Sequence, residues 1–134
     1  MTTPIASPEN VVQLDSARFT MLTSRMFRLE WAEDGVFEDR ATLRVMNRQT
    51  SPVSYTVQQN ARSLRIRTEH CTLIHKRDGK AFSKQNLEIR FRMKGKTICW
   101  WPGKSDPQNL KGTAPTLDTY SGDQCKVWVS TEEA

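Results

Sequence analysis

Four carboxylates in patterned stretches are the side chains that could carry hydrolytic chemistry: Glu30, Glu38, Asp39 and Asp118. Two carboxylates on either side of a bond can act as nucleophile and general acid–base. Glu30, however, alternates with apolar residues as an outward-facing strand residue does, and Glu38 and Asp39 lie in a turn beside Arg40. Carboxylates in such places usually form ion pairs and turn hydrogen bonds. We therefore expect no catalytic residue in this chain.

The histidines and cysteines form no recognisable metal or nucleophile pattern. His70 and His75 have no serine or cysteine partner at a catalytic spacing. Cys71, Cys99 and Cys125 occur singly, in an odd number and without a CxxC pair. Such cysteines are typical of buried reduced thiols, not of a disulfide framework or a zinc site. The sequence predicts no metal and no cofactor.

The net charge of +5 comes from one stretch of the chain. Residues 62–96 carry eleven Lys or Arg against three Asp or Glu, whereas the segments on either side are slightly acidic. A concentrated positive charge can mark a nucleic-acid surface. Here Arg65, Arg67, Arg90 and Arg92 alternate with apolar neighbours, which predicts the solvent face of strands, and no aromatic RNA-binding motif accompanies them. We expect no nucleic-acid partner.

Length and hydropathy limit the remaining classes. No apolar run approaches the roughly 18 residues of a membrane span. The first ten residues lack the basic start and apolar centre of a secretory signal, so we expect no membrane partner and a cytoplasmic location. A chain of 134 residues can hold one domain with a core, but not a (β/α)₈ barrel beside it.

Short strands are the elements that must position these residues. Apolar and polar residues alternate from residue 18 to 31, an Asp34-Gly35 turn follows, and Leu43 and Val45 restart the alternation. This pattern predicts two half-buried strands over residues 18–48. Further strands are predicted at residues 55–57, 63–68, 72–75, 87–93 and 97–100, with turn signals between them.

About seven short strands without a long helical period are typical of an all-β antiparallel sandwich. We assign residues 1–17 to a loose or extended lead-in, residues 18–118 to the sandwich and residues 119–134 to a divergent tail. The side chains predicted to face the core are Phe19, Met21, Phe27, Leu29, Trp31, Leu43, Val45, Leu64, Ile66, Leu73, Ile89 and Phe91.

Three groups of residues occur in order along this pattern. The first is RFTMLTSRMFRLEWAEDGVFEDR, residues 18–40, and the second comprises residues 72–73, 82–83 and 86–89. The third runs from Trp101-Pro102-Gly103 to Thr116-Leu117-Asp118. Together they resemble the N-terminal β-sandwich of glycoside hydrolase family 31, the α-glucosidase and α-xylosidase family, over about three quarters of the chain.

The resemblance implies a galactose-mutarotase-like sandwich, of which only the front part matches. Lys111, Ala114 and Pro115 depart from the glycine, aromatic residue and arginine of the family pattern. In the family, further sandwich strands and then a (β/α)₈ barrel follow the position of Asp118, whereas residues 119–134 resemble nothing in it. We therefore expect a truncated or shifted product, or a piece of a longer protein.

The family's nucleophile and acid–base are aspartates on barrel strands. The resemblance thus implies a non-catalytic N-terminal portion of an enzyme that hydrolyses α-glucosidic or α-xylosidic bonds with retention, within carbohydrate metabolism. Carbohydrate is the one partner it implies, through a barrel that these residues do not contain. Thr116 and Asp118 would lie in a loop near the barrel mouth, although an aspartate that caps a turn is the simpler interpretation.

The tryptophans keep a second function open. Indole rings stack on sugar faces, and adjacent residues on a strand point to opposite faces, so at most one of Trp100 and Trp101 faces inward. Trp101 is the candidate stacking aromatic, although the resemblance makes its Trp-Pro-Gly a structural corner. The alternative function is a free-standing carbohydrate-binding module, which would need an exposed aromatic platform.

Overall fold

The computed structural model describes residues 3–108. All of its elements lie in the first of two compact units, residues 1–104. Of the second unit it describes only residues 105–108, a turn in which the Gln108 backbone N–H donates to Asp106 Oδ1 at 2.9 Å. The elements are a 3-10 turn, η1 (Pro8–Asn10), and the strands β1 (Val11–Leu14), β2 (Ala17–Thr23), β3 (Met26–Trp31), β4 (Tyr55–Gln59), β5 (Ser63–Thr68), β6 (Cys71–Lys76), β7 (Leu87–Met93) and β8 (Lys96–Trp100).

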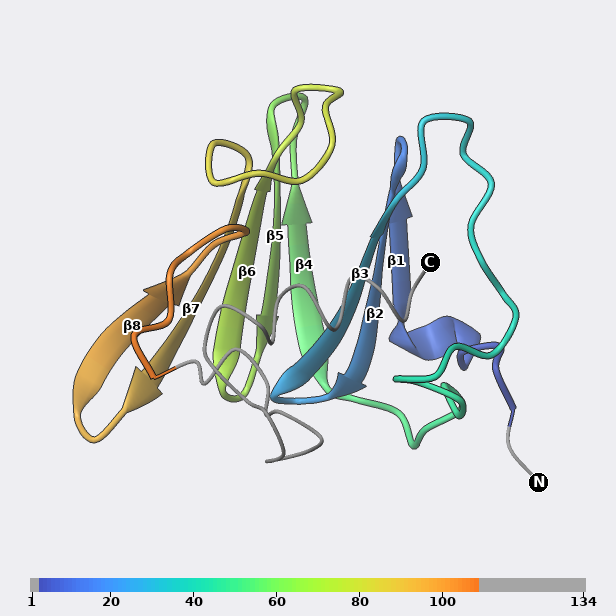
Figure 1. The fold of residues 1–134 in the computed structure, drawn as a ribbon, viewed down its shortest axis with the longest axis horizontal. Coiled ribbons are helices and arrows are strands. Elements are labelled where there is room, and N and C mark those ends of the chain that lie inside the picture. The colour runs from blue at the N-terminus through green and yellow to red at the C-terminus, as the bar shows by residue number, and fades with distance from the viewer. Residues whose placement is uncertain (1–2, 109–134) are drawn as a thin grey trace, which may run out of the picture. The chain divides into compact units, whose positions relative to one another are not determined.

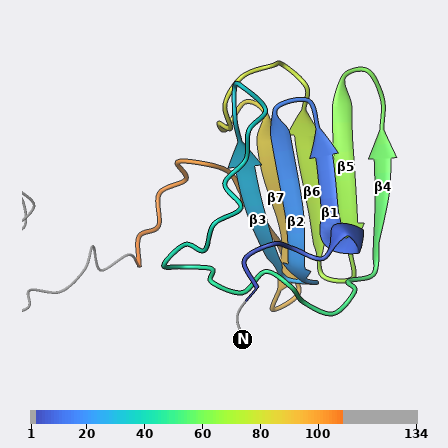
Figure 2. The same cartoon turned by 90° about the vertical axis from the view of Figure 1, so that its right-hand side faces the viewer.

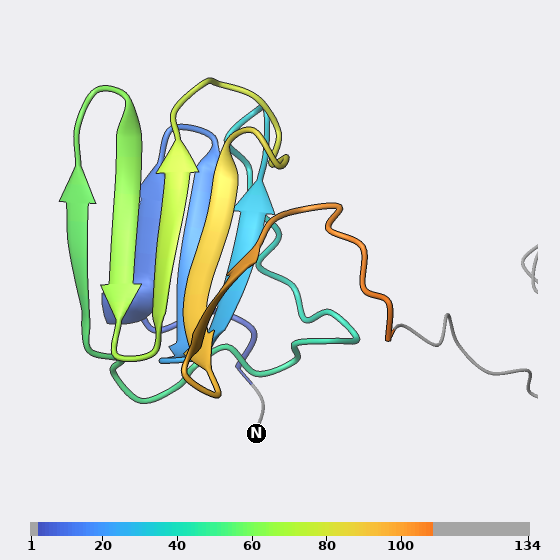
Figure 3. The same ribbon diagram turned by 90° about the vertical axis from the view of Figure 1, so that its left-hand side faces the viewer.

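Within each sheet, strands that follow one another in sequence pair antiparallel, so the strands form two meanders (Figure 1). β1, β2 and β3 make a three-stranded sheet, and β4 to β8 make a five-stranded sheet in sequence order. The side views show the smaller sheet lying face to face with the larger one (Figures 2 and 3). The all-β architecture of antiparallel sheets predicted from the sequence is confirmed.

The core lies between the two sheets. The residues predicted to face inward that are fully buried are Phe19 and Met21 on β2, Leu64 and Ile66 on β5, and Leu73 on β6. Phe27, Leu29 and Ile89 pack against this cluster and are partly buried. Burying one such side chain contributes roughly 1.5–3 kcal/mol, so this cluster is the main attraction between the sheets.

The first reversal of the chain differs from the prediction. We placed it at Asp34-Gly35, but β2 turns back at residues 24–25 and pairs with β3. The odd-numbered residues still share the inner face, because the register sets Phe19 opposite Leu29 and Met21 opposite Phe27. An alternation continued across a tight hairpin looks in sequence like one long strand.

The strand predicted around Leu43 and Val45 is wrong. Residues 36–54 form an irregular connection without strand pairing, and Leu43 is fully exposed instead of facing the core. Local bonds occupy the backbone there, since the Thr42 N–H donates to the Val45 carbonyl at 3.5 Å and Thr42 Oγ1 accepts from the Val45 N–H at 3.2 Å. Two alternating apolar residues are too short a signal to outweigh such a turn.

The lead-in is more ordered than we predicted. Residues 8–14 form η1 and β1, and β1 pairs with β2, with Val12 opposite Phe19. Val12 and Leu14 pack against the core cluster, which explains why this polar-looking segment joins the sheet. Its four-residue strand is too short for an alternation pattern to be recognised in the sequence.

Candidate functional site

Of the three residues that the sequence suggests near a sugar, the structure describes only Trp101. Thr116 and Asp118 lie outside the described residues. Trp101 follows the end of β8 and is partly buried, with Lys104 Nζ 4.5 Å from the centre of its ring. The Lys104 ammonium therefore lies over one face of the Trp101 ring. Trp100, which pairs with Ile89 across β7 and β8, is the exposed tryptophan among residues 3–108.

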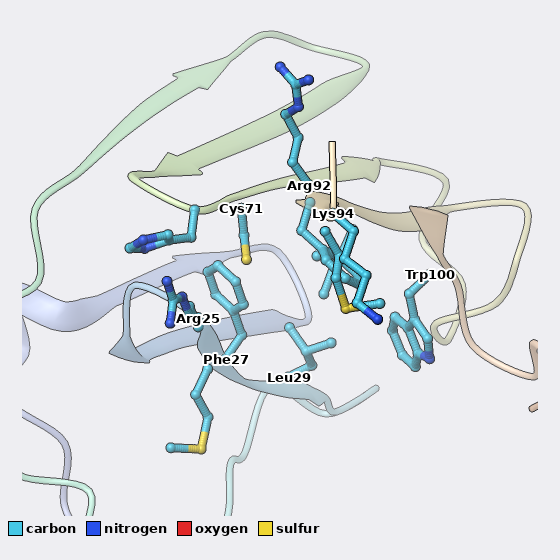
Figure 4. Close-up of a pocket in the computed structure, with 12 residues that line it drawn as sticks. Arg25, Phe27, Leu29, Cys71, Arg92, Lys94 and Trp100 are labelled. Atoms are coloured by element: carbon cyan, nitrogen blue, oxygen red, sulfur yellow. The ribbon is translucent and has the colours of Figure 1, made fainter. Parts of the chain in front are cut away.

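An apolar groove of about 800 Å³ runs between β3 and the inner face of β7 and β8 (Figure 4). Phe27 and Leu29 project into it from β3, and Trp100 stands on its opposite side. Ile89 and Phe91 belong to the same lining. The groove exists because the three-stranded sheet covers only part of the five-stranded one, leaving apolar positions of β7 and β8 without a facing strand.

The polar residues of the groove lie at its ends. His70 Nδ1 is 2.8 Å from Ser24 Oγ, which satisfies that ring nitrogen. Arg92 extends away from Phe27 and Trp100, towards solvent (Figure 4). The thiol of Cys71 points at Phe27, and burial raises its pKa, so it remains a neutral apolar contact instead of a nucleophile.

The groove lacks the groups that hydrolysis requires. No aspartate or glutamate is among the described residues that line it. Nor does the described part of the chain hold a group of three His, Cys, Asp or Glu side chains able to bind a metal ion. A retaining glycosidase needs two carboxylates about 5–5.5 Å apart, and this groove offers apolar and cationic side chains instead.

The three carboxylates that lie within the described residues, Glu30, Glu38 and Asp39, form ion pairs, as we predicted from their positions. Both oxygens of Glu30 accept from Arg18, at 2.7 and 2.8 Å, and Arg28 Nη1 also contacts Glu30. Glu38 accepts from Arg40, and these hydrogen bonds lower the pKa of Glu38 to about 2. Burial alone would raise the pKa of Glu30, but the two guanidinium groups outweigh it and the pKa is lowered.

The charged outer face of the three-stranded sheet is covered, which the sequence did not indicate. The side chains of Arg18 and Arg28 are only 14% exposed and that of Glu30 12%. Residues 36–50 lie over this face. Arg48, which belongs to this segment, lies beneath its other residues and is only 1% exposed. Arg48 donates to the backbone carbonyls of Glu38, at 2.6 Å, and Arg40, at 2.5 Å.

We call the set Arg18, Arg28, Glu30, Asp39 and Arg48 the arginine cluster. Arg18 joins its parts, since it donates to Glu30 and also to Asp39 Oδ1 at 2.7 Å. Hydrogen bonding to Glu30 raises the pKa of Arg18, whereas burial, with the nearby Arg28 charge, lowers that of Arg48. Arg48 was missed because nothing in a single sequence distinguishes a buried arginine in a connection from a solvent-exposed one.

The remaining titratable candidates are structural. His75 is buried between Phe19 and Phe82, with ring centres 5.5 Å apart in each pair, and its Nδ1 is 3.0 Å from the Asn86 carbonyl. Burial lowers the pKa of His75, so it is neutral at physiological pH. The arginines predicted to face solvent on the five-stranded sheet are confirmed as exposed: Arg65, Arg67, Arg90 and Arg92.

Neither the protein-family models nor the curated proteins contain a match to this chain. The resemblance to family 31 therefore rests on the motif residues quoted above and on nothing wider. No helix among the described residues is long and apolar enough to cross a membrane.

Proposed function

We propose that this chain is a non-catalytic N-terminal β-sandwich portion of a family 31 α-glycosidase, and that its role is to pack against further strands of the same sandwich. The observation that carries the proposal is the apolar groove between β3, β7 and β8. The catalytic aspartates of such an enzyme would lie outside this chain, on its barrel.

The groove has the geometry of an incomplete sandwich. Among the described residues β3 pairs only with β2, so its second edge offers unpaired backbone groups beside the apolar lining. An added strand would pair with that edge and cover Phe91 and Trp100 at the same time. Half-exposing three large apolar side chains costs roughly 3 kcal/mol, a large part of the ~5–15 kcal/mol that stabilises a domain.

The first motif that carries the resemblance has a structural role in this fold. Arg18, Glu30 and Asp39 belong to the arginine cluster, and Glu38 gives its carbonyl to Arg48. These residues fasten the connection after β3 onto the three-stranded sheet. A motif with this role suits a supporting domain, because its charged groups form ion pairs with one another and none is presented to a substrate.

A carbohydrate-binding module is the second candidate, favoured by one observation. Trp100 is exposed at the edge of the groove, opposite Phe27, and the groove volume is in the usual range for a small-molecule site. In that case malto- or xylo-oligosaccharides would stack on Trp100 without being hydrolysed. Few polar groups line the groove to fix sugar hydroxyls, so the scaffold is the better supported function.

Three measurements on the purified chain separate these functions. The scaffold predicts strong fluorescence of the apolar dye anilinonaphthalene sulfonate, reduced when Phe91→Ser makes the groove polar, and no response of Trp100 to oligosaccharides. The module predicts quenching of tryptophan fluorescence by oligosaccharide that is lost in Trp100→Ala and kept in Trp101→Ala. Both predict no hydrolysis of aryl α-glucosides or α-xylosides.

Two results would contradict the proposal. The first is hydrolysis of the aryl glycosides that survives repurification and disappears in Glu38→Ala, which would place catalysis in this chain. The second is the absence of any dye binding together with a sharp, monomeric thermal transition, since a complete domain would leave no apolar groove to fill.

A further inference from the structure

A small cavity of about 90 Å³ lies over the outer face of the three-stranded sheet, on the side away from the groove. Its polar lining comes from Arg18, Thr20, Arg28, Asp39 and Arg48, and apolar residues of the N-terminal segment and β1 close it. A water molecule occupies about 30 Å³, so the cavity has room for a small ion but not for a sugar or nucleotide.

One donor on the lining of this cavity is left free, and it is a single N–H group. Arg48 uses both terminal nitrogens on backbone carbonyls, and its Nε, although buried, has no hydrogen-bond partner. Arg28 Nη1, by contrast, is in contact with Glu30, which compensates its charge. An unsatisfied buried donor of a charged group is costly, so a ligand that accepts from Arg48 Nε would be stabilising.

The charges around the cavity do not cancel. Three guanidinium groups, Arg18, Arg28 and Arg48, face two carboxylates, Glu30 and Asp39, which leaves one positive charge (+3 − 2 = +1). Asp39 lies at the exposed side, since its side chain is 57% exposed, whereas Arg48 is 1% exposed. The excess positive charge is therefore concentrated at the buried end, where Arg48 lies.

We propose that the arginine cluster binds one monovalent, halide-sized anion, with chloride as the physiological ligand. A planar oxyanion is best bound by a guanidinium group that donates two parallel hydrogen bonds. The two nitrogens of Arg18 that could do so already donate to Glu30. The single free donor of Arg48 suits a spherical acceptor instead. Bound there, the anion compensates the third guanidinium charge and holds residues 36–50 onto the sheet.

The experiment compares sodium chloride with sodium gluconate at equal ionic strength on the full chain. Gluconate is too large for the cavity, so it reports ordinary screening. Chloride is expected to raise the melting temperature by a few degrees in a saturable manner, as a ligand of the native state does, and bromide should act in the same way. The ³⁵Cl resonance should broaden with protein and sharpen again when bromide competes.

Two variants and a control locate the site. Arg48→Lys keeps the charge but removes the Nε donor, and Thr20→Val keeps the shape but removes the cavity hydroxyl; each should lose the chloride-specific shift and the ³⁵Cl broadening. Arg67→Lys, on the exposed face of the other sheet, should retain both. Equal melting temperatures in chloride and gluconate, or equal broadening in Arg48→Lys and Arg67→Lys, would show that only water fills the cavity and overturn the proposal.

Discussion

Arginines alternate along strands of both sheets, yet the two sets end in opposite environments. Arg18 and Arg28 on the three-stranded sheet are 14% exposed and share Glu30. Arg90 on the five-stranded sheet is 51% exposed and pairs with Glu88 at the surface. The same sequence pattern therefore gives a covered charge network on one face and a solvated face on the other.

The difference comes from the connection between β3 and β4. Asn10 holds it, since this fully buried side chain donates to Thr50 Oγ1 at 3.1 Å and to the Ser51 carbonyl at 3.0 Å, and accepts from the Val53 N–H at 2.8 Å. Arg48 holds it further along. Alternation thus reports which face of a strand a residue occupies, but not what covers that face.

The largest loss of stability is expected when the arginine cluster loses Glu30, the carboxylate that its arginines share. Glu30→Gln leaves Arg18 and Arg28 close together without their shared carboxylate, and should lower the free energy of unfolding at pH 7 by about 3–5 kcal/mol. Glu88→Gln is the matched control on the exposed face, expected to change it by less than about 1 kcal/mol. Urea unfolding of both variants measures the comparison, and equal effects would mean that the two faces do not differ.

The second largest effect is expected from Asn10→Ala, which should lower the free energy of unfolding by about 2–3 kcal/mol. It leaves the Val53 N–H and two groups of residues 50–51 without their partner in the interior. Trypsin should then cut faster at Arg40 and Arg44 in the freed connection. Asn60→Ala, which removes exposed turn bonds to the backbone N–H groups of Arg62 and Ser63 and to the Ser63 hydroxyl, should leave the cleavage rate unchanged. A protected connection in Asn10→Ala would show that Asn10 is not its anchor.

The pH dependence of stability also tests the role of Glu30 in the covered face. The pKa of Glu30 is lowered from 4.5 in the folded chain, so its stabilisation is complete above that value and is lost as the pH falls through the folded pKa. The unfolding free energies of the wild type and Glu30→Gln should therefore converge in acid. Denaturant midpoints from pH 7 down to pH 2 test this, and a constant gap between the two proteins would contradict it.

The smallest effect is expected on the exposed face. Arg67→Gln removes a solvated charge opposite Thr56 and Thr72, and should change the free energy of unfolding by less than about 0.5 kcal/mol. A loss comparable to that of Glu30→Gln would show that the five-stranded sheet is also covered on its outer face, by a partner.

The strands of the larger sheet could be read from the sequence because each is a clear, separate alternation. Ser63–Thr68 and Leu87–Met93 were predicted with their observed bounds. The inward residues of the first, Leu64 and Ile66, are fully buried, and those of the second, Ile89 and Phe91, are partly buried. Solvent on one face and a core on the other impose that pattern directly. The sequence of these strands therefore contains nearly all the information needed to place them.

The covered face could not be read in this way. Arg48 and Asn10 are polar residues in irregular or very short elements. Asn10 bonds to residues about 40 positions away along the chain, and Arg48 bonds to carbonyls of the irregular connection itself. Leu43, by contrast, is apolar and exposed. Burial decided by distant hydrogen bonds leaves no period in the sequence, which is why the arginine cluster was missed while the ion-pairing role of Glu30 was predicted.

The meander order of both sheets has a consequence for how the chain folds. Within each sheet every pair of neighbouring strands is consecutive in sequence, so closing each hairpin costs little entropy and the sheets themselves are low in contact order. Their docking is the non-local step, because Phe19 and Met21 join a core cluster whose other large members lie on β5, β6 and β7. During synthesis the inner face of the three-stranded sheet stays uncovered until Leu64 and Ile66 leave the ribosome. We expect the nascent chain to depend on chaperones in this interval.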